Sequence, residues 1–142
     1  MKFWSKEWYD AFTKKANGDR EYLKKARRLT MKCQILGTDA PGGMDKLTIY
    51  DVERGKIKSI TTEDKKVPSD WRTVPVDQSK YTMRAIAPYD VFCQLHRGEI
   101  FPFTEVLKKG LTVQGDLAKL MSTMLAEFVL FLEFQSTVPA EY

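Results

Sequence analysis

The stretch "GLTVQGDLAKLM", residues 110–121, carries most of what the sequence says about the fold. Residues 111–114 read as a short apolar strand, and Gly115 permits a sharp change of direction because glycine adopts backbone conformations that other residues avoid. Asp116 can then accept hydrogen bonds from the free amides of a first helical turn. We therefore expect a strand to pass directly into a helix at this point.

The predicted final helix has a regular apolar face. Its apolar residues recur with the spacing of one helical side, and they are Leu117, Leu120, Met121, Met124, Leu125, Phe128 and Leu132. This pattern predicts one long amphipathic helix. Beyond Phe128 the apolar residues spread around the whole helix, so this end must be buried against more than one face of a sheet.

The rest of the chain divides into helical and extended segments. Ser5 and Asp19 are expected to cap two N-terminal helices within residues 1–30. Alternation predicts a strand from Met31 onward, and residues 45–63 read as two strands joined at the Arg54–Gly55 turn. Weaker strands are expected at 73–76 and 81–87, and short helices at 90–97 and 101–109.

Composition indicates one globular domain spanning residues 1–142. The hydrophobic content of 43% can fill a core, and 30% of the residues are charged. The N-terminal residues do not form a signal peptide, and charges interrupt the most apolar segment, so a membrane span is not expected. Two cysteines make no disulfide framework, and we expect a reduced, cytoplasmic setting.

The positive charge is concentrated at the N-terminus. Residues 1–32 carry a net charge of +6 and the remaining residues a net charge of −2. On the second predicted helix the basic residues share one face, and they are Arg20, Lys24, Lys25, Arg27 and Arg28. This face can meet an anionic membrane surface or the phosphate of coenzyme A, or it can simply be solvated. We expect no nucleic-acid binding, because no recognised motif accompanies the charge.

The order of elements and the spacing of particular residues resemble a known family. The matching residues are Gly98, Pro102, Val106, Leu107, Gly110, Val113, Gly115, Asp116 and Leu117, together with the hairpin "YDVERGKIKSI" at residues 50–60. On these positions the chain resembles the sterol carrier protein 2-like lipid-binding family over roughly residues 30–134. Residues 31–134 would form the family core, and residues 1–30 would add the N-terminal helices.

The resemblance implies an α+β fold with a function in binding. About five mostly antiparallel strands would be covered on one side by helices, with an apolar tunnel between the layers. The tunnel would hold a fatty acid, acyl-CoA, sterol or phospholipid, and the protein would transfer that ligand within the cell. The resemblance implies no catalysis, no cofactor and no metal. We expect the tunnel to be lined by Val91, Phe92, Leu95, Ile100, Phe103, Val106, Leu107, Val113, Leu117, Leu120, Met121, Met124, Leu125 and Phe128.

Three alternatives use other residues. Cys93 and His96 lie three apart on a predicted helix and could serve a small-cavity enzyme acting on an acyl thioester. With Cys33 they could bind a metal, although the spacing of a structural zinc site is absent. The strongly apolar end of the final helix could instead pair with a second copy of the chain as a homodimer.

Overall fold

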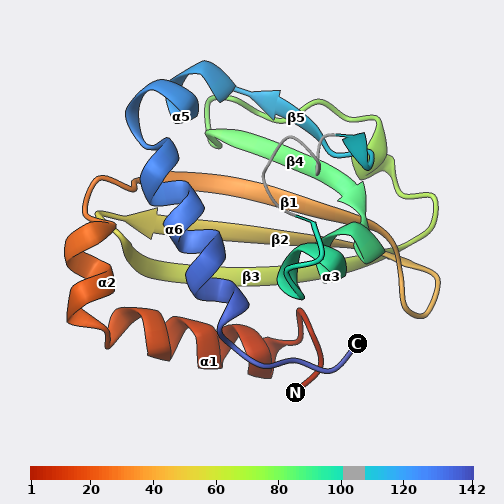
Figure 1. Cartoon of the computed structure of the whole chain (residues 1–142). Helices are drawn as coiled ribbons and strands as arrows, with labels where there is room; N and C mark the ends of the chain where they lie inside the picture. Colours follow the sequence, from red (N-terminus) through yellow and green to blue (C-terminus); the bar gives the residue numbers. More distant parts are fainter. Residues whose placement is uncertain (101–107) are drawn as a thin grey trace.

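The computed structural model describes residues 1–100 and 108–142, with the main chain alone for Leu117, Leu120 and Met121. Its centre is a five-stranded sheet in the order β3-β2-β1-β4-β5 (Figure 1). The strands are β1 (Met31–Ala40), β2 (Met44–Glu53), β3 (Lys56–Lys66), β4 (Met83–Pro88) and β5 (Thr112–Gly115). Among these strands only β1 and β4 pair in parallel, so the expectation of a mostly antiparallel α+β fold is confirmed.

The helices lie along one face of this sheet (Figure 1). They are α1 (Lys6–Asn17), α2 (Arg20–Lys25), α3 (Tyr89–His96), α5 (Leu117–Thr123) and α6 (Leu125–Ser136). Helix α6 crosses the face of the sheet diagonally, and α1 runs beside β3. Within the described ranges, no helix combines the length and the apolarity needed to cross a bilayer.

Local sequence signals place several boundaries as expected. The Ser5 hydroxyl accepts a hydrogen bond from the amide of Trp8 at 3.2 Å, and the Asp19 carboxylate accepts one from the amide of Tyr22 at 3.0 Å. Both caps satisfy amides that a first helical turn leaves free. The turn between β2 and β3 falls at Arg54–Gly55, where both residues have positive φ angles.

The passage from β5 into α5 depends on Gly115. Its φ is +105°, and a Cβ atom there would lie 2.7 Å from the carbonyl oxygen of Thr82. Neither the backbone conformation nor the space therefore admits a side chain. The Asp116 carboxylate accepts a hydrogen bond from the amide of Lys119 at 2.9 Å, which confirms the predicted cap.

The prediction of one long C-terminal helix is wrong. Met124, with φ −147° and ψ 24°, leaves the helical conformation and separates α5 from α6. Two consecutive hydroxyl residues precede the break, and the hydroxyls of Ser122 and Thr123 both donate to the carbonyl oxygen of Lys119. Such side-chain bonds compete with the main-chain ladder and bend helices, and this gives a local reason for the break.

The strand expected at 73–76 is also wrong, since these residues follow a 3₁₀ turn at Asp70–Arg72 without joining the sheet. Pro75 has no amide hydrogen to offer a neighbouring strand. The buried guanidinium of Arg84 donates instead to the carbonyl oxygens of Trp71 and Val74. This segment therefore packs beside β4 as an irregular cover.

The N-terminal helices cover the strongly apolar end of α6. Trp8, Phe12 and Ala16 of α1 are fully buried. The ring of Phe131 lies 5.3 Å from that of Phe12, and the ring of Phe134 lies 4.4 Å from that of Tyr22, measured between centroids. The expectation that this end of the helix needs a second covering layer is confirmed.

Candidate functional site

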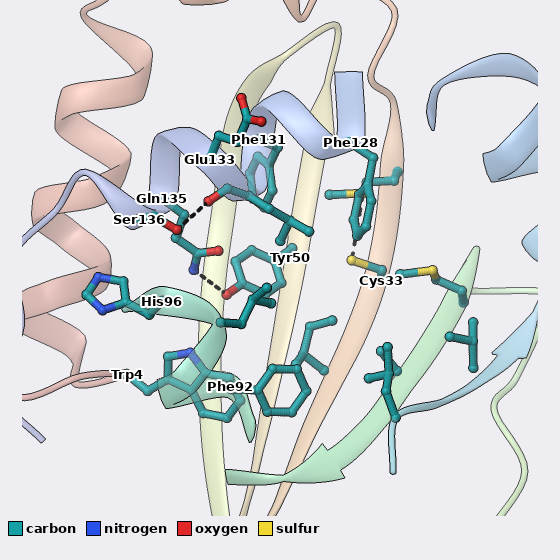
Figure 2. A pocket seen from close by; sticks show the side chains of 18 of the residues that line it. Trp4, Cys33, Tyr50, Phe92, His96, Phe128, Phe131, Glu133, Gln135 and Ser136 are labelled. Atoms are coloured by element: carbon teal, nitrogen blue, oxygen red, sulfur yellow. Dashed lines mark hydrogen bonds between the residues drawn. The ribbon is translucent and has the colours of Figure 1, made fainter. Parts of the chain in front are cut away.

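A cavity of about 290 Å³ lies between the helical layer and the sheet (Figure 2). Its floor consists of side chains from the helix-covered face of the sheet, namely Met31, Cys33 and Ile35 of β1, Tyr50 of β2, Met83 and Ala85 of β4, and Val113 of β5. The residues on β1 and β4 alternate because successive strand residues point to opposite faces. The floor is therefore built from three central strands and one edge strand.

Two helices and the N-terminal segment complete the walls. The contributions are Phe92, Leu95 and His96 of α3 with Gly98 beyond it, Phe128, Phe131, Leu132, Glu133, Gln135 and Ser136 of α6, Phe3 and Trp4 before α1, and Leu111 before β5. Most of these side chains are apolar, and among the described lining residues there is no Lys or Arg. Such a lining suits an uncharged, apolar ligand.

The predicted lining residues fall into three groups. Phe92, Leu95, Val113 and Phe128 line the cavity. Val91, Ile100 and Met124 are buried and Leu125 is half-buried, but these four do not line it. Phe103, Val106 and Leu107 lie outside the described residues, as do the side chains of Leu117, Leu120 and Met121. Contact of any of these residues with a ligand stays a prediction.

Apart from Val113, the residues of the cavity floor and of its N-terminal wall were not predicted from the sequence. Met31, Cys33 and Ile35 follow the two-residue period of a strand, and this signal could have indicated one face. It was ambiguous because Gln34 and Leu36 on the opposite face are also buried. The four-residue spacing of Trp4, Trp8 and Phe12 predicts that all three lie on one side of the first helix, whereas α1 begins at Lys6 and Trp4 precedes its cap.

One chain of buried polar groups reaches the cavity. The Gln135 amide nitrogen donates to the Tyr50 hydroxyl at 2.9 Å, and that hydroxyl donates to the Tyr9 hydroxyl at 3.2 Å. The Tyr9 hydroxyl in turn pairs with the Thr48 hydroxyl at 3.0 Å. Burial raises the pKa of both tyrosines well above the usual range, so they stay neutral and link both α6 and α1 to β2.

The structure shows no hydrogen bond between His96 and either cysteine among the described residues. Both thiols are buried and free, and burial raises the pKa of Cys33 to about 12 and also raises the pKa of Cys93. The His96 ring nitrogens pair instead with the Tyr142 hydroxyl and, at 2.8 Å, with the carbonyl oxygen of Val138. Across residues 1–100 and 108–142, no group of three or more His, Cys, Asp or Glu side chains could hold a metal ion.

The basic residues near α2 form an exposed surface. Arg20, Lys24, Lys25, Arg27 and Arg28 are all exposed, and Lys25 pairs with Glu21 at 3.0 Å. The opposite side of this segment is buried through Tyr22, Ala26 and Leu29. The separation into a basic face and an apolar face is thus confirmed, while its partner is not identified by the geometry.

Solved structures share this fold. No protein-family model matches the sequence, and no curated protein matches it significantly. A conserved hypothetical protein from Thermus thermophilus, described as a candidate sterol carrier protein, superposes with a TM-score of 0.75 at 14% identity, over 99% of this chain and 92% of that one. A crystal structure of sterol carrier protein 2 gives 0.71 at 14% identity, over 97% and 100%.

A third structure, the sterol carrier protein domain 2 of Helicoverpa armigera, gives a TM-score of 0.58 at 12% identity, over 96% of this chain and 91% of that one. At these identities the likeness concerns the fold. The chain therefore has the fold of sterol carrier protein 2, as the sequence resemblance implied.

Proposed function

We propose that this protein binds one elongated apolar molecule of lipid type in the cavity beneath α6 and carries it between sites in the cell. The observation that supports this most directly is the cavity itself, which lies among apolar side chains of the sheet, α3 and α6. The neighbours described as sterol carrier proteins share the fold that encloses it. The proposed ligands are fatty acids, acyl-CoAs, sterols and phospholipids, held in a tunnel that this cavity would form part of.

Burial of the chain would supply the affinity. Each methylene group removed from water contributes about 0.8 kcal/mol, so a long chain binds without any specific polar contact. The same additivity makes discrimination between neighbouring chain lengths weak, at roughly fourfold per methylene group. A carrier of this kind would accept a range of related ligands.

The test is a series of saturated alcohols and acids of increasing chain length that displace the apolar dye N-phenylnaphthylamine. The affinity should rise by roughly fourfold per added methylene group and then level off once the cavity is full. Absence of displacement by every member of the series would contradict the proposal. Dye displacement that does not depend on chain length would point to a surface site instead.

We propose binding without catalysis, against the alternative of an enzyme acting on an acyl thioester. The raised pKa of Cys93 and the engagement of His96 by Val138 and Tyr142 support this choice, because a thiolate is the reactive form of cysteine. The test compares hydrolysis of a long-chain acyl-CoA by the wild type and by Cys93→Ala, His96→Ala. Hydrolysis by the wild type that the double substitution abolishes would support the enzyme alternative and contradict binding without catalysis.

The exposed basic surface near α2 is proposed to make transient contact with an anionic membrane or a coenzyme A phosphate. The test is sedimentation with phosphatidylserine vesicles, comparing Lys24→Glu with the matched control Lys56→Glu at an exposed position of β3. Only the first should weaken binding, and salt should weaken it further. Equal binding by both variants would remove this contact from the proposal.

A homodimer through α6 remains a prediction. Its strongly apolar end is covered by α1 and α2, and Leu130 is half-buried. Light scattering on the wild type and Leu130→Lys tests the pairing. A wild-type dimer that the substitution dissociates would support it, and a monomer in both cases would dismiss it.

A further inference from the structure

Two polar side chains at the cavity lack a hydrogen-bond partner for one of their atoms among the described residues. They are Trp4, which is 2% exposed, and Gln135, which is 9% exposed. Both belong to the cavity wall, one from the N-terminal segment and one from α6 (Figure 2). A buried polar group without a partner is unfavourable, and a bound molecule can supply the partner.

The free atom of Gln135 is its amide oxygen. The amide nitrogen is used in the bond to Tyr50 at 2.9 Å, and Tyr50 is held in turn by its 3.2 Å bond to Tyr9. This chain holds the amide in place and leaves the oxygen without a donor among the described residues. Gln135 therefore presents a hydrogen-bond acceptor at the cavity.

The free atom of Trp4 is its indole nitrogen, for which the structure shows no acceptor among residues 1–100 and 108–142. Figure 2 shows this nitrogen on the edge of the indole that faces Gln135 and Tyr50. The ring packs 4.9 Å from that of Phe92 and 5.5 Å from that of Tyr89, measured between centroids. Trp4 therefore presents a fixed hydrogen-bond donor.

The backbone places the Trp4 ring at an energetic cost. The φ of Trp4 is +64°, a conformation that bulky residues rarely adopt. The adjoining main chain is held by bonds from the Phe3 amide to Glu141 at 2.8 Å and from the Ser5 amide to Lys2 at 3.1 Å. A Cβ atom at Gly37 would lie 2.5 Å from the ring, so β1 carries a glycine where the indole rests.

Both free atoms are open to space that a ligand can enter. Among the described residues, the Tyr22 hydroxyl is the one fully enclosed side-chain polar atom without a partner. The Trp4 nitrogen and the Gln135 oxygen are therefore not sealed within the protein. Since both residues are at least nine-tenths buried and line the cavity, the cavity is the space they meet.

The charges around the cavity disfavour an ionised head group. The described lining includes no Lys or Arg, and the exposed carboxylate of Glu133 lies on the α6 wall. A carboxylate or phosphate placed beside Trp4 and Gln135 would be buried with no Lys or Arg from the described lining to pair with it, which is unfavourable. A neutral hydroxyl carries no such penalty.

We propose that Trp4 and Gln135 form a head-group subsite that takes the hydroxyl of a neutral lipid alcohol and discriminates against ionised lipids. The hydroxyl donates a hydrogen bond to the Gln135 oxygen and accepts one from the Trp4 nitrogen. The inference rests on the proposed function, because it names the ligand class of that same cavity. It assigns the choice of ligand to two residues on different segments of the chain.

The test uses three ligands with the same chain, hexadecane, hexadecanol and hexadecanoate, at a pH of about 8 where the acid is ionised. Affinities are measured by displacement of N-phenylnaphthylamine from the wild type, Trp4→Phe and Gln135→Met. The readout is the ratio of the affinities for the alcohol and the alkane. Because both share the apolar chain, this ratio is insensitive to a general loss of binding.

Each substitution should lower this ratio by about two- to tenfold, the effect of one hydrogen bond. Trp71→Phe and Gln94→Leu, which change an indole and an amide away from the cavity lining, should leave it unchanged. A ratio unaffected by both Trp4→Phe and Gln135→Met would overturn the subsite, as would tighter wild-type binding of hexadecanoate than of hexadecanol. Failure of the wild type to bind any of the three would refute the proposed function itself.

Discussion

Replacing Ala85 with leucine should weaken ligand binding without unfolding the protein. Ala85 is 5% exposed, lies on β4 and lines the cavity floor. In register it lies opposite Ile35 of β1 and Val113 of β5, which also line the floor. A larger side chain at this position therefore extends into open space within the 290 Å³ cavity.

The magnitude follows from the three carbon atoms that leucine adds. They displace about three methylene groups of the ligand, and at about 0.8 kcal/mol each the loss is roughly 2.4 kcal/mol, or about fiftyfold in affinity. The free energy of unfolding should stay within about 1 kcal/mol of the wild-type value or rise, because the new side chain fills a void.

Ala87 provides a matched control on the same strand and the same face. It is 1% exposed and does not line the cavity. Ala87→Leu should overpack the core and reduce stability by about 1–3 kcal/mol. This loss corresponds to about 3 °C in melting temperature per kcal/mol for a domain of this size.

The assays are thermal unfolding of both variants and displacement of the dye by hexadecanol. We expect Ala85→Leu to bind hexadecanol weakly and to melt at the wild-type temperature, while Ala87→Leu melts at a lower temperature. If Ala85→Leu destabilises the protein as much as Ala87→Leu, the space beside Ala85 is already filled in solution. That result would refute the presence of an open cavity at this position.

Three further predictions concern stability and reactivity. Asp45→Asn should lower stability by about 3 kcal/mol at pH 7, because Arg72 and Ser69 donate to this buried carboxylate and hold its pKa well below the usual range. The deficit in urea denaturation should persist above a pH of about 4 and shrink as the pH falls further; a constant deficit down to strongly acidic pH would contradict this. Phe131→Ala should cost about 3–5 kcal/mol, since the ring is 1% exposed and packs on Phe12 and Tyr50, and a loss below about 1 kcal/mol would show that α1 does not cover α6 in solution. Cys33 and Cys93 should react with a thiol reagent at least about a hundredfold more slowly in the folded than in the urea-unfolded protein, and equal rates would disagree with their burial.

Local signals in the sequence predicted the elements that local chemistry determines. The caps at Ser5, Asp19 and Asp116 each depend on residues within one helical turn. The Arg54–Gly55 turn likewise needs only residues that tolerate a positive φ. These features could be placed without knowing what lies around them, and the structure confirms them.

Features that depend on distant segments could not be placed in the same way. The parallel pairing of β1 with β4 places Cys33 beside Met83, fifty positions later in the sequence. No local sequence pattern predicts this pairing. The cavity floor depends on this pairing and on which face of β1 the helices cover. Because both faces of β1 are buried, the alternation of residues does not identify that face.

The position of Trp4 could not be predicted from the sequence for a different reason. Its spacing from Trp8 and Phe12 matches a helical face, yet its φ of +64° places it outside α1. Contacts with Phe92, Tyr89 and Gly37, all remote in sequence, determine where the ring lies. The break at Met124 was missed because the apolar period continues through it while the hydroxyls of Ser122 and Thr123 bond to the main chain.

Native mass spectrometry of the purified protein, followed by solvent extraction of the bound material, tests the central claim most directly. We expect a complex heavier than the chain by the mass of one lipid, and the extract should contain a neutral lipid alcohol. An ionised lipid in the extract would support the carrier and contradict the head-group subsite. A chain that is free of ligand when purified, and that stays free after incubation with hexadecane, hexadecanol and hexadecanoate, would contradict the proposal that this cavity carries a lipid.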